Sequence, residues 1–208
     1  MTIERRELLA DVAVHALGLA LGVAGVVAML AVAAQSSVHG QLLPVTVYLA
    51  GLLAMLGCSA LYHIWRSCRW RDWLRRFDHA AIFVMIAGTY TPLVLRLPQG
   101  WALGLTVGVW TAAAVGVVAK LFQPRRIEAL SVALYLVLGW VGVIAAEPLL
   151  ASLDQATLIL LLVGGIVYSA GVVFHLAAHW RYARALWHGS VVIAATIHYA
   201  AIMTLLQA

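Results

Sequence analysis

The sequence predicts an all-α membrane protein, a single bundle of seven transmembrane helices with its N-terminus in the cytoplasm and its C-terminus outside. Of 208 residues, 64% are hydrophobic and only 10% are charged, and the mean hydropathy is +0.99. One soluble core of this length could not bury so much apolar surface. Short polar breaks also divide the chain into seven apolar runs, each close to the roughly 20 residues that a helix needs to cross a bilayer.

In chain order, the predicted helices cover about 12–34, 42–65, 79–97, 101–119, 129–146, 156–178 and 185–206. The breaks between them carry Gly, Pro, Gln, Ser and nearly all the charge, as expected where the backbone meets water. Small residues recur in the first run (GLALGVAG), the fifth (LGWVGVIAA) and the sixth (GGIVYSAGVV). They let helices approach closely in lipid. No stretch remains for a soluble domain, so residues 1–208 form one transmembrane domain.

The orientation follows from the basic residues, because Lys and Arg in short loops favour the cytoplasm. Twelve of the 13 lie before the first run or in the second, fourth and sixth breaks, and only Arg96 lies on the other side. The net charge of +5 is spread over separate loops, which indicates topology and not a nucleic-acid surface. The twelve are Arg5, Arg6, Arg66, Arg69, Arg71, Arg75, Arg76, Lys120, Arg125, Arg126, Arg181 and Arg184.

This topology brings ionisable residues of three helices to one depth. His63 closes the second predicted helix, Asp78 opens the third, and His188 lies in the first turns of the seventh. Ser59 precedes His63 by four residues, so their side chains share a helix face. Ionisable groups at membrane depth are costly and usually face the bundle interior. The pattern therefore predicts a shared polar site at the cytoplasmic side, with Asp78 and Ser59 as candidate catalytic residues.

Two interpretations of this site stay open. Neutral imidazoles beside a carboxylate suit Zn²⁺, which can activate a bound water. Two histidines, however, do not complete a three-ligand zinc site, and histidines near an interface often only cap a helix or reach toward water. Asp11 and His15 have i, i+4 spacing near the cytoplasmic end of the first helix, and we interpret them as a capping or structural pair.

Six motifs, in the order SALYHIW, FDHAAIF, AGTYTPL, YLVLGWVGVI, GGIVYSAGVVF and LWHGSVVIAATIHYAAI, resemble those of the hemolysin III proteins of bacteria. That family belongs to the progestin and adiponectin receptor superfamily, which is similar to alkaline ceramidases. The resemblance implies a multi-pass protein of the bacterial cell (inner) membrane with a cytoplasm-side zinc site. By this resemblance His63 and His188 are metal ligands, and Asp78 and Ser59 act beside the metal.

The chain departs from the family pattern at one position. The resemblance implies a further histidine four residues before His188, where this sequence has Arg184. A guanidinium is always charged and cannot bind zinc. His175 and His179, in HLAAH, have the same spacing at the end of the sixth helix. His179 is the candidate substitute as third ligand, and the alternative is that both histidines only cap the helix end at the interface.

Three functions are then in competition, all in contact with membrane lipids. In the first, zinc and Asp78 activate water to hydrolyse a lipid amide or ester. In the second, Arg184 pairs with Asp78 in place of a metal, which leaves a metal-free relative acting in membrane lipid homeostasis. The substitution at Arg184 favours the second, and the resemblance favours the first. The third is a pore-forming cytolytic protein, although no predicted helix carries the full-length polar stripe that a water-filled channel needs.

Overall fold

The computed structural model describes residues 2–35, 40–123 and 130–207, and in this part of the chain all regular structure is helical. Seven segments are long and apolar enough to cross a membrane, which agrees with the predicted all-α class. The fifth, Ser131–Ser152, is made of three consecutive pieces, α5, η1 and α6. The elements are α1 (Ile3–Gln35), α2 (Leu42–Ile64), α3 (Arg71–Val94), α4 (Gln99–Phe122), α5 (Ser131–Gly139), the 3₁₀ helix η1 (Val141–Ala145), α6 (Ala146–Ser152), α7 (Gln155–Leu176) and α8 (Ala183–Gln207).

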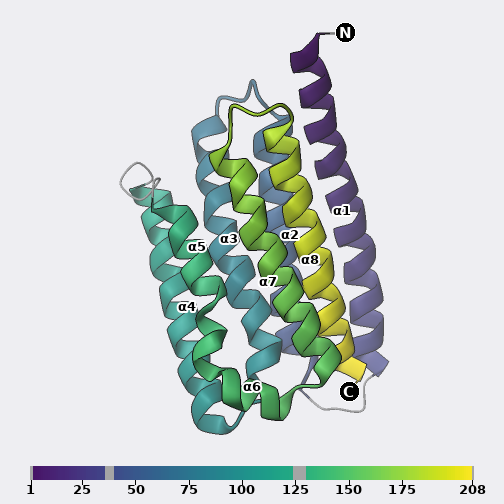
Figure 1. Ribbon diagram of the computed structural model, residues 1–208, viewed down its shortest axis with the longest axis vertical. Helices are drawn as coiled ribbons and strands as arrows, with labels where there is room; N and C mark the ends of the chain where they lie inside the picture. The colour runs from purple at the N-terminus through teal and green to yellow at the C-terminus, as the bar shows by residue number, and fades with distance from the viewer. Residues whose placement is uncertain (1, 36–39, 124–129, 208) are drawn as a thin grey trace.

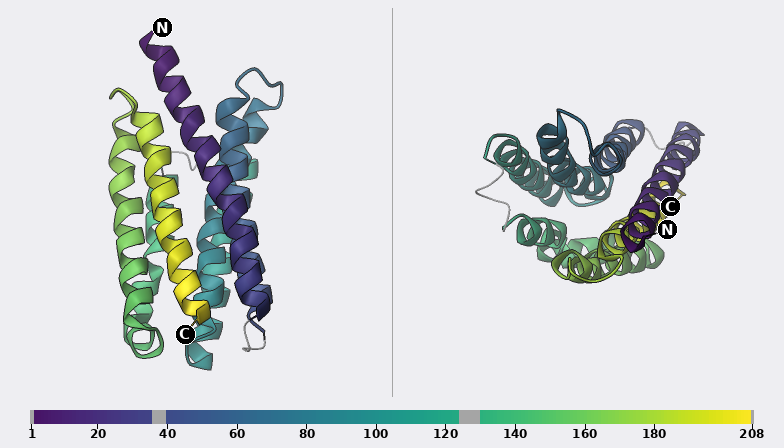
Figure 2. Two further views of the ribbon diagram at one scale, coloured as in Figure 1. Left: turned by 90° about the vertical axis from the view of Figure 1, so that its right-hand side faces the viewer. Right: turned by 90° about the horizontal axis from the view of Figure 1, so that it is seen from above.

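The helices stand side by side in a ring that is closed by the first and last of them (Figure 2). α2 packs chiefly against α3, α3 against α4, and α7 against α8, while α1 packs against both α2 and α8. The start of α1 and the α2–α3 and α7–α8 connections lie at one end of the bundle, and the C-terminus lies at the other (Figure 1). We call the first end the arginine-rich end, because it carries Arg5, Arg6, the arginines of 66–76, Arg181 and Arg184.

Two helices begin earlier than hydropathy predicts. α1 starts at Ile3 and α3 at Arg71, ahead of the predicted starts at 12 and 79. Both extensions contain several Arg residues and Leu, and the α1 extension also contains Glu. These residues favour helix, so the helices continue beyond the apolar runs. Asp78 therefore lies two turns inside α3 instead of at its first residue. The predicted start of the fifth helix at 129, together with Arg125 and Arg126, falls outside the described residues.

Glycine sets the spacing of α2 and α3. A Cβ atom on Gly51 would lie 3.2 Å from the Met85 Cα atom, and one on Gly88 would lie 3.3 Å from the Val47 carbonyl oxygen. The two backbones therefore approach more closely than side chains would allow, as small residues permit in membrane helices. This close packing holds His63 on α2 and Asp78 on α3 at one depth.

The fifth span is interrupted where α5 ends and η1 begins, and Tyr90 of α3 bridges the break. Its hydroxyl donates to the Gly139 carbonyl oxygen at 2.7 Å and accepts from the Gly142 backbone N–H at 2.8 Å. Non-helical backbone at membrane depth is tolerated only where protein satisfies its polar groups. On the other side of the break, the Trp140 indole N–H donates to the Ser169 hydroxyl of α7 at 3.0 Å. Hydrogen bonds to α3 and to α7 thus stabilise the interruption.

At the opposite end of the bundle, Asp154 caps the N-terminus of α7. Its carboxylate accepts from the Thr157 backbone N–H at 2.9 Å. Hydrogen bonds from Thr157 hold the pKa of Asp154 below its ordinary value, as expected for a carboxylate that accepts donors in its charged form. The cap therefore contributes fully at neutral pH, and this contribution is lost as the pH falls below the carboxyl's ordinary pKa and through its lowered pKa.

Replacing Tyr90 by phenylalanine should destabilise the bundle. The Tyr90→Phe variant leaves the Gly139 carbonyl and the Gly142 N–H without their shared partner, at a cost of roughly 1–3 kcal/mol. We expect a lower midpoint of thermal unfolding in detergent, measured by the loss of circular dichroism. Tyr182→Phe is the control, because Tyr182 is exposed, and it should unfold like the unaltered protein. Equal midpoints for both variants would show that the bridge contributes nothing.

Candidate metal centre

Four helices converge on a polar cluster near the arginine-rich end. α1 contributes Asp11 and His15, α2 contributes His63, α3 contributes Asp78, and α8 contributes His188. All but His63 are buried, and Asp11 is only 2% exposed. Helical spacing explains the local arrangement, since residues four apart share a face: Asp11 and His15 do so on α1, as do Ser59 and His63 on α2. The cluster therefore forms where the first and last helices meet the α2–α3 pair.

His15, His63 and His188 form the centre of this cluster. Each offers one ring nitrogen such that the three atoms lie within 4.8 Å of one another. The ring centroids are 5.2 Å apart for His15 and His63, 4.4 Å for His15 and His188, and 4.3 Å for His63 and His188. Three imidazoles with an open fourth position are a ligand set found in catalytic zinc sites. The arrangement could hold a metal ion.

Two carboxylates flank the histidines. Asp11 Oδ1 lies 2.6 Å from His188 Nδ1, and Asp11 Oδ2 lies 3.8 Å from His63 Nδ1. On the other side, Asp78 Oδ2 lies 3.6 Å from His63 Nε2. Ser59 completes the group, with its hydroxyl oxygen 3.3 Å from His15 Nε2. The cluster thus combines three possible metal ligands with two carboxylates and a hydroxyl.

The charges of this cluster fit a divalent cation. Within the described residues, the ion pairs of Asp11 and Asp78 are all with histidines, and none is with Lys or Arg. Buried charges need a partner, because desolvation of an unpaired ion is expensive. With neutral histidines, two carboxylates would balance the two positive charges of one metal ion. The residues present therefore suit a metal ion chemically as well as geometrically.

The position of Arg184 bears on its expected role. This residue is exposed on the first turn of α8 and lies at the wall of the internal cavity. In the described part of the chain no ion pair joins Arg184 to Asp78, whose carboxylate faces His63. The structure therefore gives no support, within the described residues, to the predicted replacement of the metal by an Arg184–Asp78 pair. As the second residue of α8, Arg184 precedes His188 by one turn, so it lies nearer the end of the bundle.

His179 also lies elsewhere than expected. It is exposed after the end of α7, with its ring centroid 6.2 Å from that of Trp180, and it is not part of the three-histidine group. His175 is one turn back on α7, with its ring centroid 5.2 Å from that of Trp187. The third histidine of the group is His15. His179 is an exposed residue of the α7–α8 connection, whereas α1 brings His15 to the cavity wall.

Asp11 and His15 are the site residues that sequence reasoning missed. The structure confirms that the two residues form a pair, since the His15 Nδ1–H donates to the Asp11 carbonyl oxygen at 2.8 Å. The side chains of this pair also face the other histidines, so they do more than cap a helix. Both residues are ionisable and interrupt an otherwise apolar segment. Such residues usually face a functional interior, and this signal would have assigned them to the site.

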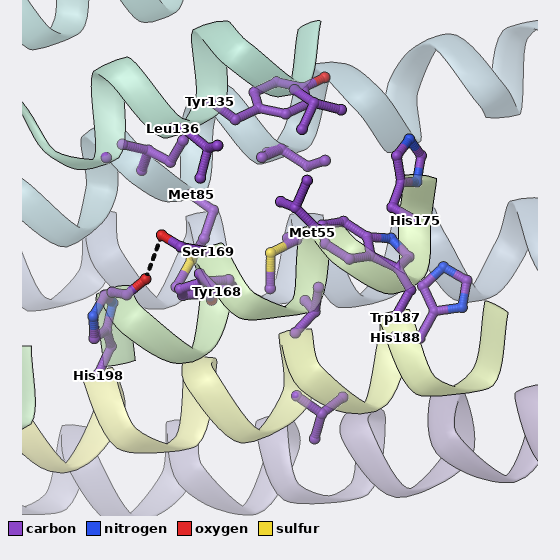
Figure 3. A pocket seen from close by; sticks show the side chains of 18 of the residues that line it. Met55, Met85, Tyr135, Leu136, Tyr168, Ser169, His175, Trp187, His188 and His198 are labelled. Carbon is purple, nitrogen blue, oxygen red and sulfur yellow. Dashed lines mark hydrogen bonds between the residues drawn. The ribbon is translucent and has the colours of Figure 1, made fainter. Parts of the chain in front are cut away.

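An internal cavity of about 1330 Å³ adjoins the cluster. His15, Ser59, His63, Asp78 and His188 all line its wall. Figure 3 shows His188 at one end of the view and His198 at the other, with Met55, Met85, Tyr168 and Leu136 among the side chains between them. The lining continues through Leu93, Val94 and Leu149 near the opposite end of the bundle. A long and mostly apolar space thus opens onto the polar cluster.

The fold and the site define an integral membrane protein of seven spans with a buried histidine–carboxylate centre at one end. The family model for haemolysin-III-related proteins matches residues 5–199, and the chain belongs to that family. It is 37% identical to a hemolysin-3 homolog of Bacillus subtilis over 188 residues, which cover 89% of this chain and 88% of that protein. It is 32% identical to hemolysin-3 of Bacillus cereus over 186 residues, which cover 88% and 84% of the two chains.

More distant similarity reaches animal proteins. The human monocyte to macrophage differentiation factor is 29% identical over 164 residues, which cover 75% of this chain and 67% of that protein. The match covers three quarters of this chain and therefore extends over most of the helical bundle.

The structure and the sequence predict different third ligands, which a pair of variants distinguishes. If the centre binds a metal ion, His15→Ala should lower the metal content of the purified protein well below one ion per chain, because two histidines and a distant carboxylate form a weak site. His179→Ala should leave the metal content unchanged. The metal is measured by atomic emission after dialysis against buffer without chelator. Loss of the metal in His179→Ala but not in His15→Ala would reverse the assignment.

Proposed function

We propose that this protein is a metal-dependent hydrolase of membrane lipids, with zinc held by His15, His63 and His188. One observation carries the proposal: a three-histidine centre with Asp78 and Ser59 beside it forms part of the wall of a long apolar cavity. The cavity exceeds the roughly 300–1,000 Å³ of ordinary small-molecule pockets, so it has room for an acyl chain. A zinc ion at this centre supplies a Lewis acid that polarises a carbonyl and makes water more acidic.

The residues around the centre have complementary roles in hydrolysis. Asp78 accepts a proton from a water molecule while the oxygen of that water attacks the carbonyl carbon of a lipid amide or ester. The bond from that carbon to the leaving nitrogen or oxygen breaks, and Asp78 returns the proton to the leaving atom. Positioned carboxylates act as such general acid–base groups. The Ser59 hydroxyl donates a hydrogen bond that orients the attacking water or the carbonyl oxygen.

The cavity orients the substrate. Its apolar wall binds the acyl chain along the bundle axis and so brings the carbonyl to the polar end. Holding the reacting atoms in place removes much of the entropic cost of reaction. The burial of the site also strengthens the interactions of Asp78, since charges interact more strongly away from water.

The location and orientation of the protein are part of the proposal. The bacterial relatives favour the plasma membrane of a bacterium, and the concentration of arginine at one end favours the cytoplasmic side for that end. The metal centre would then lie at the inner face of the membrane. Lipids are the proposed partners.

Asp78→Asn tests the catalytic role directly. Asparagine has nearly the same shape but cannot accept the proton, so hydrolysis should fall by about 10²–10⁴-fold while zinc stays bound. The measurement is the release of free fatty acid from ceramide and phospholipid substrates by purified protein. Asp72→Asn is the matched control, because Asp72 is exposed on the same helix, and it should keep full activity. Full activity in Asp78→Asn would remove Asp78 from the mechanism.

The two Bacillus relatives are named as hemolysins, which supports a second function, cytolysis through a pore. The described helices argue for the hydrolase instead, because the cavity is lined mainly by apolar side chains, and a conducting pore needs a polar lining along its length.

Liposomes separate these two functions. We expect vesicles loaded with a self-quenching dye to keep their contents when the protein is reconstituted at high density, because the cavity within the described helices is lined mainly by apolar side chains. Empty vesicles and vesicles with a known pore-forming toxin are the controls. Rapid dye release that scales with protein density would favour the pore.

A further inference from the structure

Asp11 contacts all three histidines of the candidate metal centre. The His188 Nδ1 atom is 2.6 Å from one oxygen of its carboxylate, and the His63 Nδ1 atom is 3.8 Å from the other. The His15 Nδ1 atom is 2.8 Å from the backbone carbonyl oxygen of the same residue and 3.7 Å from its carboxylate. Asp11 of α1 therefore faces the Nδ1 atom of each of the three histidines.

Hydrogen-bond chemistry fixes which nitrogen of these rings carries the proton. A carbonyl oxygen only accepts, so the His15 Nδ1 atom must be the donor in its bond to Asp11. An ionised carboxylate also only accepts, so the His188 Nδ1 atom donates to Asp11. In a neutral imidazole the other nitrogen then has the free lone pair. His15 and His188 are thus held in the form whose Nε2 atoms can bind a metal.

The opposite edges of the rings face the rest of the site. The His15 Nε2 atom lies 3.3 Å from the Ser59 hydroxyl, and the His63 Nε2 atom lies 3.6 Å from Asp78. The side chains with proposed roles in hydrolysis are therefore on the Nε2 side, and Asp11 is on the Nδ1 side. Metal-binding histidines commonly give their second N–H to a carboxylate or carbonyl, which orients the ring and raises its basicity.

We propose that Asp11 is the positioning residue of the metal centre. Hydrogen bonds from the Nδ1 atoms of His15 and His188 to Asp11 set the tautomer and orientation of these two rings, the Asp11 carboxylate lies beside His63, and Asp11 does not bind the metal itself. This inference rests on the proposed metal function. It assigns α1 a direct part in the site, since both His15 and the group that orients the histidines come from this helix. The negative charge of Asp11, buried beside neutral rings, also favours a cation at their centre.

Zinc affinity of the purified full chain is the first test, measured by competition with a chromophoric chelator. Loss of a carboxylate that orients metal ligands typically weakens binding by about 10–100-fold. Asp11→Ala should therefore raise the Kd for zinc by that factor while saturating at the same stoichiometry. Asp11→Asn, which keeps the shape and one acceptor oxygen, should show a smaller loss. Glu4→Gln removes a carboxylate from an exposed position on the same helix and should bind zinc as the unaltered protein does.

Nitrogen-15 NMR of histidine-labelled protein provides a second measurement that does not depend on zinc or activity. The unaltered apo protein should show the Nδ1–H tautomer for His188, assigned by its loss in His188→Ala. Asp11→Ala should shift that resonance toward a tautomer mixture, and Glu4→Gln should not. An unchanged zinc Kd in Asp11→Ala, or an unchanged His188 tautomer, would overturn the positioning role.

The remaining outcomes are distinct. If Asp11→Ala and Asp11→Asn both abolish zinc binding as completely as His188→Ala does, Asp11 is itself a ligand and the positioning role is wrong. If the unaltered protein binds no zinc, both the proposed metal-dependent function and the inference about Asp11 are wrong. Normal zinc binding in the unaltered protein with no effect of the Asp11 variants would refute only the inference about Asp11.

Discussion

Charge inside a bilayer must be compensated by the protein itself, and this constraint shapes the whole arginine-rich end of the bundle. Asp11 and Asp78 are buried carboxylates whose ion-pair partners, in the described chain, are histidines. Desolvating an unpaired carboxylate costs several kcal/mol, so the helices that carry these residues cannot separate without a large penalty. The polar cluster thus holds α1, α2, α3 and α8 together at one depth, where lipid gives helices no hydrophobic reason to associate.

The remainder of the bundle makes that convergence compatible with a large internal space. Gly51 and Gly88 bring α2 and α3 into backbone contact, which fixes the relative height of His63 and Asp78. Across the cavity, Tyr90 and Trp140 hold the interrupted fifth span to α3 and α7. Directional hydrogen bonds replace dense packing there, so the wall keeps its shape beside a cavity of about 1330 Å³.

Hydropathy was sufficient for the fold class, because the length of an apolar run directly reflects the thickness of the bilayer. It also brought His63, Asp78 and His188 to one depth, since helix ends align with the membrane surface.

Hydropathy did not predict which residues of one depth meet, because depth does not say which neighbour a helix face contacts. The i, i+4 spacing of Asp11 and His15 shows that they share a face but not which neighbour that face meets, and only the packing of α1 between α2 and α8 answers this. His179 was a candidate ligand because it is close to His188 along the chain, yet it is exposed in the α7–α8 connection and is not part of the three-histidine group. The break in the fifth span depends on the distant Tyr90, which no local pattern reveals.

The contact between Asp11 and His188 joins residues 177 positions apart in the chain. Membrane helices are inserted in the order of their synthesis, so α1 enters the bilayer long before α8 exists. During that interval Asp11 lacks its shortest partner, and the three-histidine group cannot form. The three-histidine centre is therefore complete only once α8 has joined the bundle, and a chain that has lost α8 would leave Asp11 with His15 and His63 as its remaining histidine neighbours.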